Sequence, residues 1–195
     1  MPASAETQRV IRYVVYSKTT GQIIHTHSQS SVEDEEYAEV PIEEVRAMLS
    51  TTLDFVRQLN NLAPDDIDVL KVELDDPGSK LGAMMVDPRQ LKLIPRPSLA
   101  LSADKGELVG DGQDSTLIEI VLADADGRPM DGAAAALKIT TNRGKLSARG
   151  GLVELVNGRA SMTLTSANET VTGVRVRAEH VDRIFVPAHL DLEFV

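Results

Sequence analysis

Residues 158–166 read Gly-Arg-Ala-Ser-Met-Thr-Leu-Thr-Ser, and residues 174–179 read Val-Arg-Val-Arg-Ala-Glu. In both stretches an apolar side chain alternates with a polar one, which is the period of a β-strand with one buried face. A period of two also occurs in residues 115–122, where Ile118, Ile120 and Leu122 face one way, and in residues 190–194, Leu-Asp-Leu-Glu-Phe. Repeated alternation of this kind in one half of a chain predicts an all-β sandwich.

The alternation also identifies the side chains that we expect in the sandwich core. These are Ile118, Ile120, Met162, Leu164, Val174 and Val176. Turn signals separate the strands, at residues 124–129, at residues 141–144 and at Asn157-Gly158, a dipeptide favoured in tight hairpins. The chain has no cysteine, so apolar packing alone must hold the two sheets together.

Three motifs in this half carry a family resemblance. They are Asp111-Gly112-Gln113-Asp114-Ser115, the turn from Asp124 to Pro129, and Gly144-Lys145-Leu146-Ser147. Together with residues 157–166 they resemble a bacterial immunoglobulin-like domain of the invasin and intimin type. The resemblance implies an immunoglobulin-like fold for nearly all of residues 98–195. Such domains serve as spacers or displayed heads in adhesins and in phage virion proteins alike.

The amino-terminal half has a different pattern, which predicts an α+β domain. Two β-prone runs, residues 9–17 and 22–27, flank Gly21 and predict a hairpin. Apolar residues at spacings of three and four then predict one amphipathic helix over residues 42–59, beginning after Pro41. Short strands are expected at residues 67–74, 83–86 and 90–94.

Pro95-Arg96-Pro97 separates the two halves, because neither proline has an amide donor for a helix or a sheet interior. We therefore expect two domains, an α+β anchoring domain over residues 1–96 and an immunoglobulin-like domain over residues 97–195. The anchoring role rests on the apolar stripe of the predicted helix, which a neighbouring subunit could cover. The predicted assembly interface comprises Ile42, Val45, Leu49, Leu53 and Val56.

The amino-terminal half weakly resembles small tailed-phage virion and tail proteins. The residues concerned are Arg12–Tyr16, the segment Thr20-Gly21-Gln22-Ile23, and Met85-Val86-Asp87 leading to Leu93–Pro97. The inserted helix is a departure from that pattern. The resemblance implies a structural protein of a phage particle.

Composition restricts the possible partners. The chain has 30 acidic residues against 20 Lys and Arg, a net charge of −10, and such a field repels nucleic acid and anionic lipid headgroups. No apolar stretch approaches the roughly 20 residues that span a bilayer, and no signal peptide is recognisable at the amino terminus. We expect a chain made in the cytoplasm.

Few residues suggest chemistry. His25 and His27 share one strand face, which suits either a metal site or incidental histidines on an exposed edge strand. Only acidic loop residues such as Glu33 are near in sequence, and they do not define a third ligand. The segment Asp124-Ala125-Asp126-Gly127 imitates the start of a calcium loop but lacks its third acidic position and the Glu at its end, so a turn with Gly at positive φ explains it more simply. The acidic residues 33–39 are interpreted as solvated rather than as a docking site for a basic partner. No catalytic motif is present, so we predict no enzyme activity, no metal and no cofactor.

Two functions remain open. The first is a structural and interaction protein of a tailed-phage particle, in the tail, the baseplate or as a capsid decoration, located in the virion and bound to other virion proteins and to copies of itself. The alternative is a bacterial surface or secreted binding module of the adhesin type. In either case the immunoglobulin-like domain is the part expected to meet a host-surface glycan or protein.

Overall fold

The computed structural model describes residues 10–30, 40–59, 62–73 and 81–195. The chain divides into two compact units, residues 1–95 and residues 96–195, so the division falls within the proline-containing segment. Among the described residues, no helix has the length and apolar character needed to cross a membrane.

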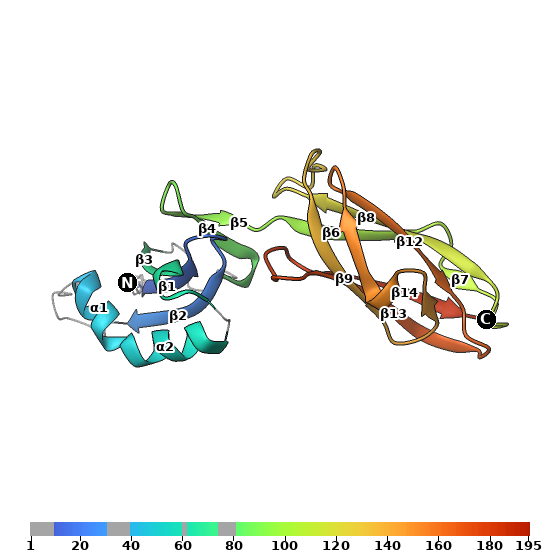
Figure 1. Cartoon of the computed structure of the whole chain (residues 1–195), viewed down its shortest axis with the longest axis horizontal. Helices are drawn as coiled ribbons and strands as arrows, with labels where there is room; N and C mark the ends of the chain where they lie inside the picture. The colour runs from blue at the N-terminus through green and yellow to red at the C-terminus, as the bar shows by residue number, and fades with distance from the viewer. Residues whose placement is uncertain (1–9, 31–39, 60–61, 74–80) are drawn as a thin grey trace, which may run out of the picture. The chain divides into compact units, whose positions relative to one another are not determined.

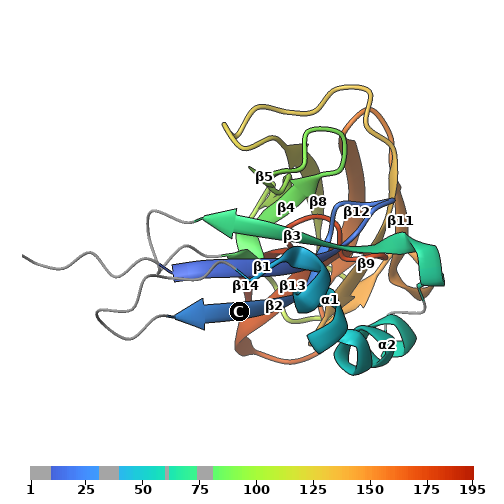
Figure 2. The same ribbon diagram turned by 90° about the vertical axis from the view of Figure 1, so that its left-hand side faces the viewer.

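Unit 1 is built on a three-stranded antiparallel sheet in the order β2-β1-β3 (Figure 2). The strands are β1 (Val10–Ser17), β2 (Ile23–Ser30) and β3 (Ile67–Glu73). The central strand β1 is buried on both faces: Tyr13 and Val15 pack on one side, Val14 and Tyr16 on the other. This explains why residues 13–16, Tyr-Val-Val-Tyr, form a continuous apolar run rather than an alternating one.

One face of this sheet is covered by two short helices, α1 (Ile42–Met48) and α2 (Ser50–Leu59). The prediction of one unbroken helix over residues 42–59 was therefore wrong in one respect, because the regular helix is interrupted at Leu49. Leu49 is itself buried in the same core cluster as Val45. The apolar stripe continues through the interruption, and periodicity alone does not reveal such a break.

The opposite face is covered by a hairpin of β4 (Met84–Asp87) and β5 (Lys92–Pro95). The sequence predicted two short strands here, but not that they cover this face. Val86 is fully buried against Val14 and Tyr16. Its amide donates to the carbonyl of Gly21 at 2.8 Å. Gly21 has a φ of +73°, and a Cβ there would lie 2.0 Å from the Val86 carbonyl oxygen. The turn between β1 and β2 therefore requires glycine.

Unit 2 is an immunoglobulin-like β-sandwich of two sheets (Figure 1). Sheet 1 has the order β10-β12-β8-β6, with strands β10 (Lys145–Leu146), β12 (Arg159–Thr165), β8 (Ser115–Ala123) and β6 (Ser98–Ala103). Sheet 2 has the order β11-β9-β13-β14-β7, with strands β11 (Leu152–Leu155), β9 (Ala135–Thr141), β13 (Val171–His180), β14 (Ala188–Phe194) and β7 (Glu107–Leu108).

The core between the two sheets confirms the predicted alternation. The side chains expected there are all buried, namely Ile118, Ile120, Met162, Leu164, Val174 and Val176. Register agrees as well, since Met162 of β12 lies opposite Ile118 of β8. The Asn157-Gly158 turn between β11 and β12 has positive φ at both residues, as a tight hairpin requires.

We predict that each unit folds alone, because each has its own core clusters. Limited digestion with a protease of broad specificity should cut near Pro95 and leave a resistant carboxy-terminal fragment. The fragment should show a cooperative thermal transition by circular dichroism. A fragment that is degraded as fast as the rest, or that lacks a transition, would contradict the division.

A second prediction concerns the core. Ile120→Ala should lower the free energy of unfolding of unit 2 by roughly 2–5 kcal/mol, through lost burial and a cavity. Leu117→Ala is the matched control on the same strand, because Leu117 is 43% exposed, and it should cost about 0.5 kcal/mol or less. Urea unfolding of the isolated fragment gives both values. Similar losses in the two variants would mean that the strand faces are exchanged.

Candidate functional site

The apolar stripe predicted as an assembly interface lies largely inside unit 1. Val45 and Leu49 are buried, and Ile42 and Leu53 pack half-buried against the same cluster. The side chain of Val56 lies outside the described residues. The stripe therefore serves the unit's own core, because the sheet that it covers needs an apolar lid on that face. Its further use as an interface stays a prediction.

The outward side of the two helices carries different residues. Met48 and Phe55 are each 61% exposed. A large apolar side chain that projects this far contributes little to folding and is available to a partner. The sequence pattern did not single these two residues out, since it counts apolar positions without showing which face is covered.

His25 and His27 lie on one face of β2, as predicted, opposite Val15 and Tyr13 of β1. That face is the one that the helices cover, so these imidazoles are half-buried rather than fully exposed. The ring of His27 lies 6.5 Å from the ring of Tyr13. Among the described residues, no group of three potential ligands gathers around a possible metal site. Glu33 lies outside the described residues, as do the other members of the acidic run 33–39.

The residues resembling a calcium loop form a turn. Asp124 accepts hydrogen bonds from the backbone amides of Asp126 and Arg128, both at 2.9 Å. The carboxylate of Asp126 pairs with the guanidinium of Arg128 at 3.1 Å. Gly127 has positive φ. The two carboxylates thus act within the turn, which agrees with the simpler interpretation of the sequence.

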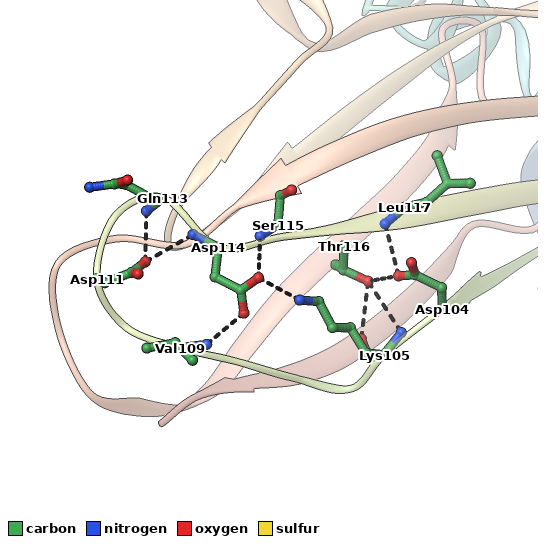
Figure 3. A network of polar contacts seen from close by, with 9 residues as sticks. All are labelled: Asp104, Lys105, Val109, Asp111, Gln113, Asp114, Ser115, Thr116 and Leu117. Atoms are coloured by element: carbon green, nitrogen blue, oxygen red, sulfur yellow. Dashed lines mark hydrogen bonds and ion pairs between the residues drawn. The ribbon is translucent and has the colours of Figure 1, made fainter.

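A network of carboxylates organises the loops between β6 and β8 (Figure 3). Asp114 accepts hydrogen bonds from the amides of Val109 and Ser115, both at 2.8 Å, and from the ammonium of Lys105. Asp111 accepts the amides of Gln113 and Asp114, both at 2.8 Å. The Asp-Gly-Gln-Asp-Ser motif therefore satisfies backbone donors of its own loop, which explains the need for aspartate at both positions.

Asp104 is the third carboxylate of this network. It accepts hydrogen bonds from the hydroxyl of Thr116 and from the amide of Leu117. The Thr116 bond is the main cause that holds the pKa of Asp104 below its ordinary value. The pKa of Asp114 is lowered chiefly by Lys105, and that of Asp111 chiefly by the amide of Asp114. The three ionised carboxylates therefore stabilise the loops fully at pH values above the ordinary aspartate pKa. This stabilisation is lost as the pH falls through their lowered pKa values.

The outer face of sheet 2 is charged and internally paired. Arg175 of β13 binds Asp191 of β14 through two hydrogen bonds, of 2.7 and 3.1 Å. Arg177 pairs with Glu179 at 3.1 Å on the same strand. These exposed pairs contribute little to stability, but they keep the centre of this face polar. A partner that recognises an apolar surface would have to bind elsewhere.

The edge of the same sheet has a different character. Strand β11 is an edge strand and pairs only with β9 within unit 2. Its Leu155 is buried in the core, whereas Leu152 is 60% exposed and Val156, just after the strand, is 59% exposed. Natural edge strands are commonly protected by charge, proline or short length. Glu154 is the one charged residue between these two exposed apolar side chains.

The sequence pattern does not reveal this edge. The run Leu-Val-Glu-Leu-Val at residues 152–156 is too uniformly apolar to show which side chains face the core. The neighbouring Asn157-Gly158 turn was recognised, and it marks the end of an exposed hairpin. A strand with apolar residues on both faces, directly before such a turn, is the sequence signal that could have indicated this edge.

Comparison with known proteins gives similarity to solved structures alone. No protein-family model matches the chain, and no curated protein matches it. A carboxy-terminal fragment of intimin, solved in complex with the intimin-binding domain of the translocated intimin receptor, is 29% identical, with a TM-score of 0.40 over 50% of this chain and 33% of that chain.

Two further similar structures are from other proteins. The adhesin InvE of Yersinia pseudotuberculosis is 20% identical, with a TM-score of 0.39 over 50% of this chain and 27% of that chain. A family 2 glycosyl hydrolase from Bacteroides cellulosilyticus is 12% identical, with a TM-score of 0.46 over 98% of this chain and 25% of that chain. The chain thus spans less than two thirds of each of these proteins.

The two faces of the helices can be tested against each other. Leu49→Ala should lower the free energy of unfolding of the intact chain's unit 1 by roughly 2–5 kcal/mol, because Leu49 is buried against the sheet. Phe55→Ala should change it by about 0.5 kcal/mol or less, because Phe55 projects outward. Hydrogen exchange of β1 amides reports on this unit. Equal destabilisation by both substitutions would show that Phe55 also packs within the unit rather than projecting outward.

Proposed function

We propose that the chain is a binding module of the adhesin type, in which the immunoglobulin-like unit presents the edge strand β11 to a partner protein. The observation that carries the proposal is the exposure of Leu152 and Val156 on that edge. An edge strand offers backbone donors and acceptors to an added strand, and the two side chains offer apolar contact beside them. This combination suits an extended segment of another protein.

The other edges of the sandwich are less suitable. Strands β7 and β10 are each two residues long, and short edges support little added pairing. The first residue of β6 is bridged to Val186, and the amide of Leu99 donates to the Val186 carbonyl at 3.0 Å. All residues of unit 2 are described, and its four edge strands are β6, β7, β10 and β11. Of these, β11 is longer than two residues and, unlike β6, has no bridge to Val186 at its start.

Unit 1 is proposed as the anchor. Its sheet is covered on both faces by its own helices and hairpin, so attachment would use side chains that project from the covering layer, such as Met48 and Phe55. Copies of the same chain and other proteins of the same assembly are the proposed partners of this unit. Incorporation into a tailed-phage particle, with location in the virion, remains the second prediction for the assembly.

Cell binding tests the proposal. The fluorescently labelled intact chain is added to cultured animal cells and to bacterial cells, and bound fluorescence is measured against concentration. We expect saturable binding to one of the two. The double variant Leu152→Lys and Val156→Lys should bind at least about tenfold more weakly, as expected when central apolar contacts are replaced.

The matched control is the double variant Val109→Lys and Leu117→Lys, which adds the same charge at two other exposed apolar positions of unit 2. It should bind like the unchanged chain. Absence of saturable binding, or equal loss in both variants, would count against the proposal. Recovery of the chain in purified phage particles by mass spectrometry would support the virion assignment instead.

A further inference from the structure

The loop between β13 and β14, residues 181–187, is organised by a buried histidine. His180 is 8% exposed, and its ring meets the ring of Phe185 edge-on, with centroids 4.6 Å apart. The Nδ1 atom accepts a hydrogen bond from the amide of Asp182 at 2.9 Å. A nitrogen that accepts a hydrogen bond carries no proton, so this contact requires the neutral ring.

The backbone of the same loop is held in an uncommon conformation. Arg183 has a φ of +57°, in the left-handed region that residues other than glycine seldom adopt. Its amide donates to the carbonyl of His180 at 2.9 Å. Such a conformation persists where surrounding contacts favour it. It turns the carbonyl groups of residues 183–185 toward one side chain, that of Arg96.

Arg96 binds all three of these carbonyls. Its Nε donates to Ile184 at 2.9 Å, and its Nη2 donates to Phe185 at 2.9 Å and to Arg183. The backbone continues the attachment, since Val186 donates to the Pro97 carbonyl at 2.9 Å and Leu99 donates to the Val186 carbonyl at 3.0 Å. Five hydrogen bonds thus join Arg96, Pro97 and Leu99, at the start of unit 2, to residues 183–186 of this loop.

We propose that these contacts form a pH-sensitive latch: the neutral ring of His180 shapes the loop that holds Arg96, and protonation of the ring releases Arg96 and opens the hydrogen bonds that join Val186 to Pro97 and Leu99, while β6 stays paired with β8. Residues 96–99 and 180–186 are called the latch below. The proposal concerns unit 2 alone. It adds a conformational device to a segment that the sequence marks as a plain linker.

The physical reason lies in the hydrogen-bonding capacity of the ring. A protonated imidazole is a hydrogen-bond donor at both nitrogens. The N–H group at Nδ1 would then point at the N–H group of Asp182, and the hydrogen bond between them would be lost. Burial also disfavours the charged ring, and it is the main cause that lowers the pKa of His180; the charge of Asp182 opposes it. The cation would in addition lie on the same loop as the bound guanidinium of Arg96.

Other charged groups near His180 do not remove this conflict. On β9 the residue opposite His180 is Leu137. Lys138 of β9 and Glu179 of β13 pair with each other in register and belong to the outer face of the sheet. Strand β14 begins with Ala188 and strand β6 with Ser98, which are uncharged. Within the loop, Arg183 is exposed and would add positive charge.

The sign of the pH dependence follows. Because the folded loop favours neutral His180, the latch is fully closed above the ordinary histidine range. It loses stability as the pH falls from that range through the lowered pKa of His180. The carboxylate network between β6 and β8 responds at lower pH, in the aspartate range, so the two effects are separable.

Hydrogen exchange on the intact chain tests the latch. Protection factors of the Val186 and Leu99 amides should fall about tenfold or more between about pH 7 and pH 5, after correction for the intrinsic exchange rate. The amide of Leu122, which donates to the Gly158 carbonyl in the core region at 2.9 Å, serves as the internal reference and should not change. A pH-independent protection of Val186 would overturn the proposal.

Two variants separate the titration from the attachment. His180→Gln keeps an uncharged acceptor, so Val186 should stay protected at both pH values. Arg96→Gln removes the guanidinium, so Val186 and Leu99 should lose protection at both. Persistence of the pH effect in His180→Gln would overturn the proposal. If either variant lowers the protection of Leu122, the variant is not correctly folded, and NMR titration of His180 in the unchanged chain is the deciding measurement. A histidine pKa near the ordinary value of about 6.5 would contradict a ring that the loop holds neutral.

Discussion

The arrangement of unit 2 depends on the burial of alternate aliphatic side chains between two sheets. With no cysteine in the chain, no covalent bond fixes the distance or the register of the sheets. Ile118, Ile120 and Leu164 are fully buried, and a shift of one residue in any of their strands would expose them and bury polar neighbours. The same constraint decides which residues remain outside, and therefore which surfaces a partner can reach.

This constraint explains which features the sequence could predict. The period of two in β8, β12, β13 and β14 arises because one strand face packs in the core and the other faces solvent, and those strands were recognised with the correct faces. The break at Leu49 was not, because the apolar spacing continues unchanged across it. The stripe of Val45 and Leu49 was recognised as apolar, but a pattern does not show whether its cover is the same chain or another one.

The residues that we now propose as functional escaped prediction for specific reasons. Leu152 and Val156 belong to a run without alternation, so no face could be assigned to them. Arg96 stands between two prolines and carries the signature of a linker, yet its partners are backbone carbonyls more than eighty positions later in the chain. Backbone acceptors have no sequence signature, and a contact of that separation is determined by the fold as a whole.

Edge protection connects these observations. A sandwich has two sheets and so four edges, each of which must be shortened, covered or left for a partner. Here β7 and β10 are short, and the start of β6 is covered by the loop that Arg96 holds. Release of that loop would expose the carbonyl of Pro97 and the amide of Leu99, which now pair with Val186. The latch covers one edge of the sandwich, and β11 is left uncovered at another. Both follow from the need to pair the backbone groups of a sheet edge, because an edge that its own chain does not cover is open to another chain.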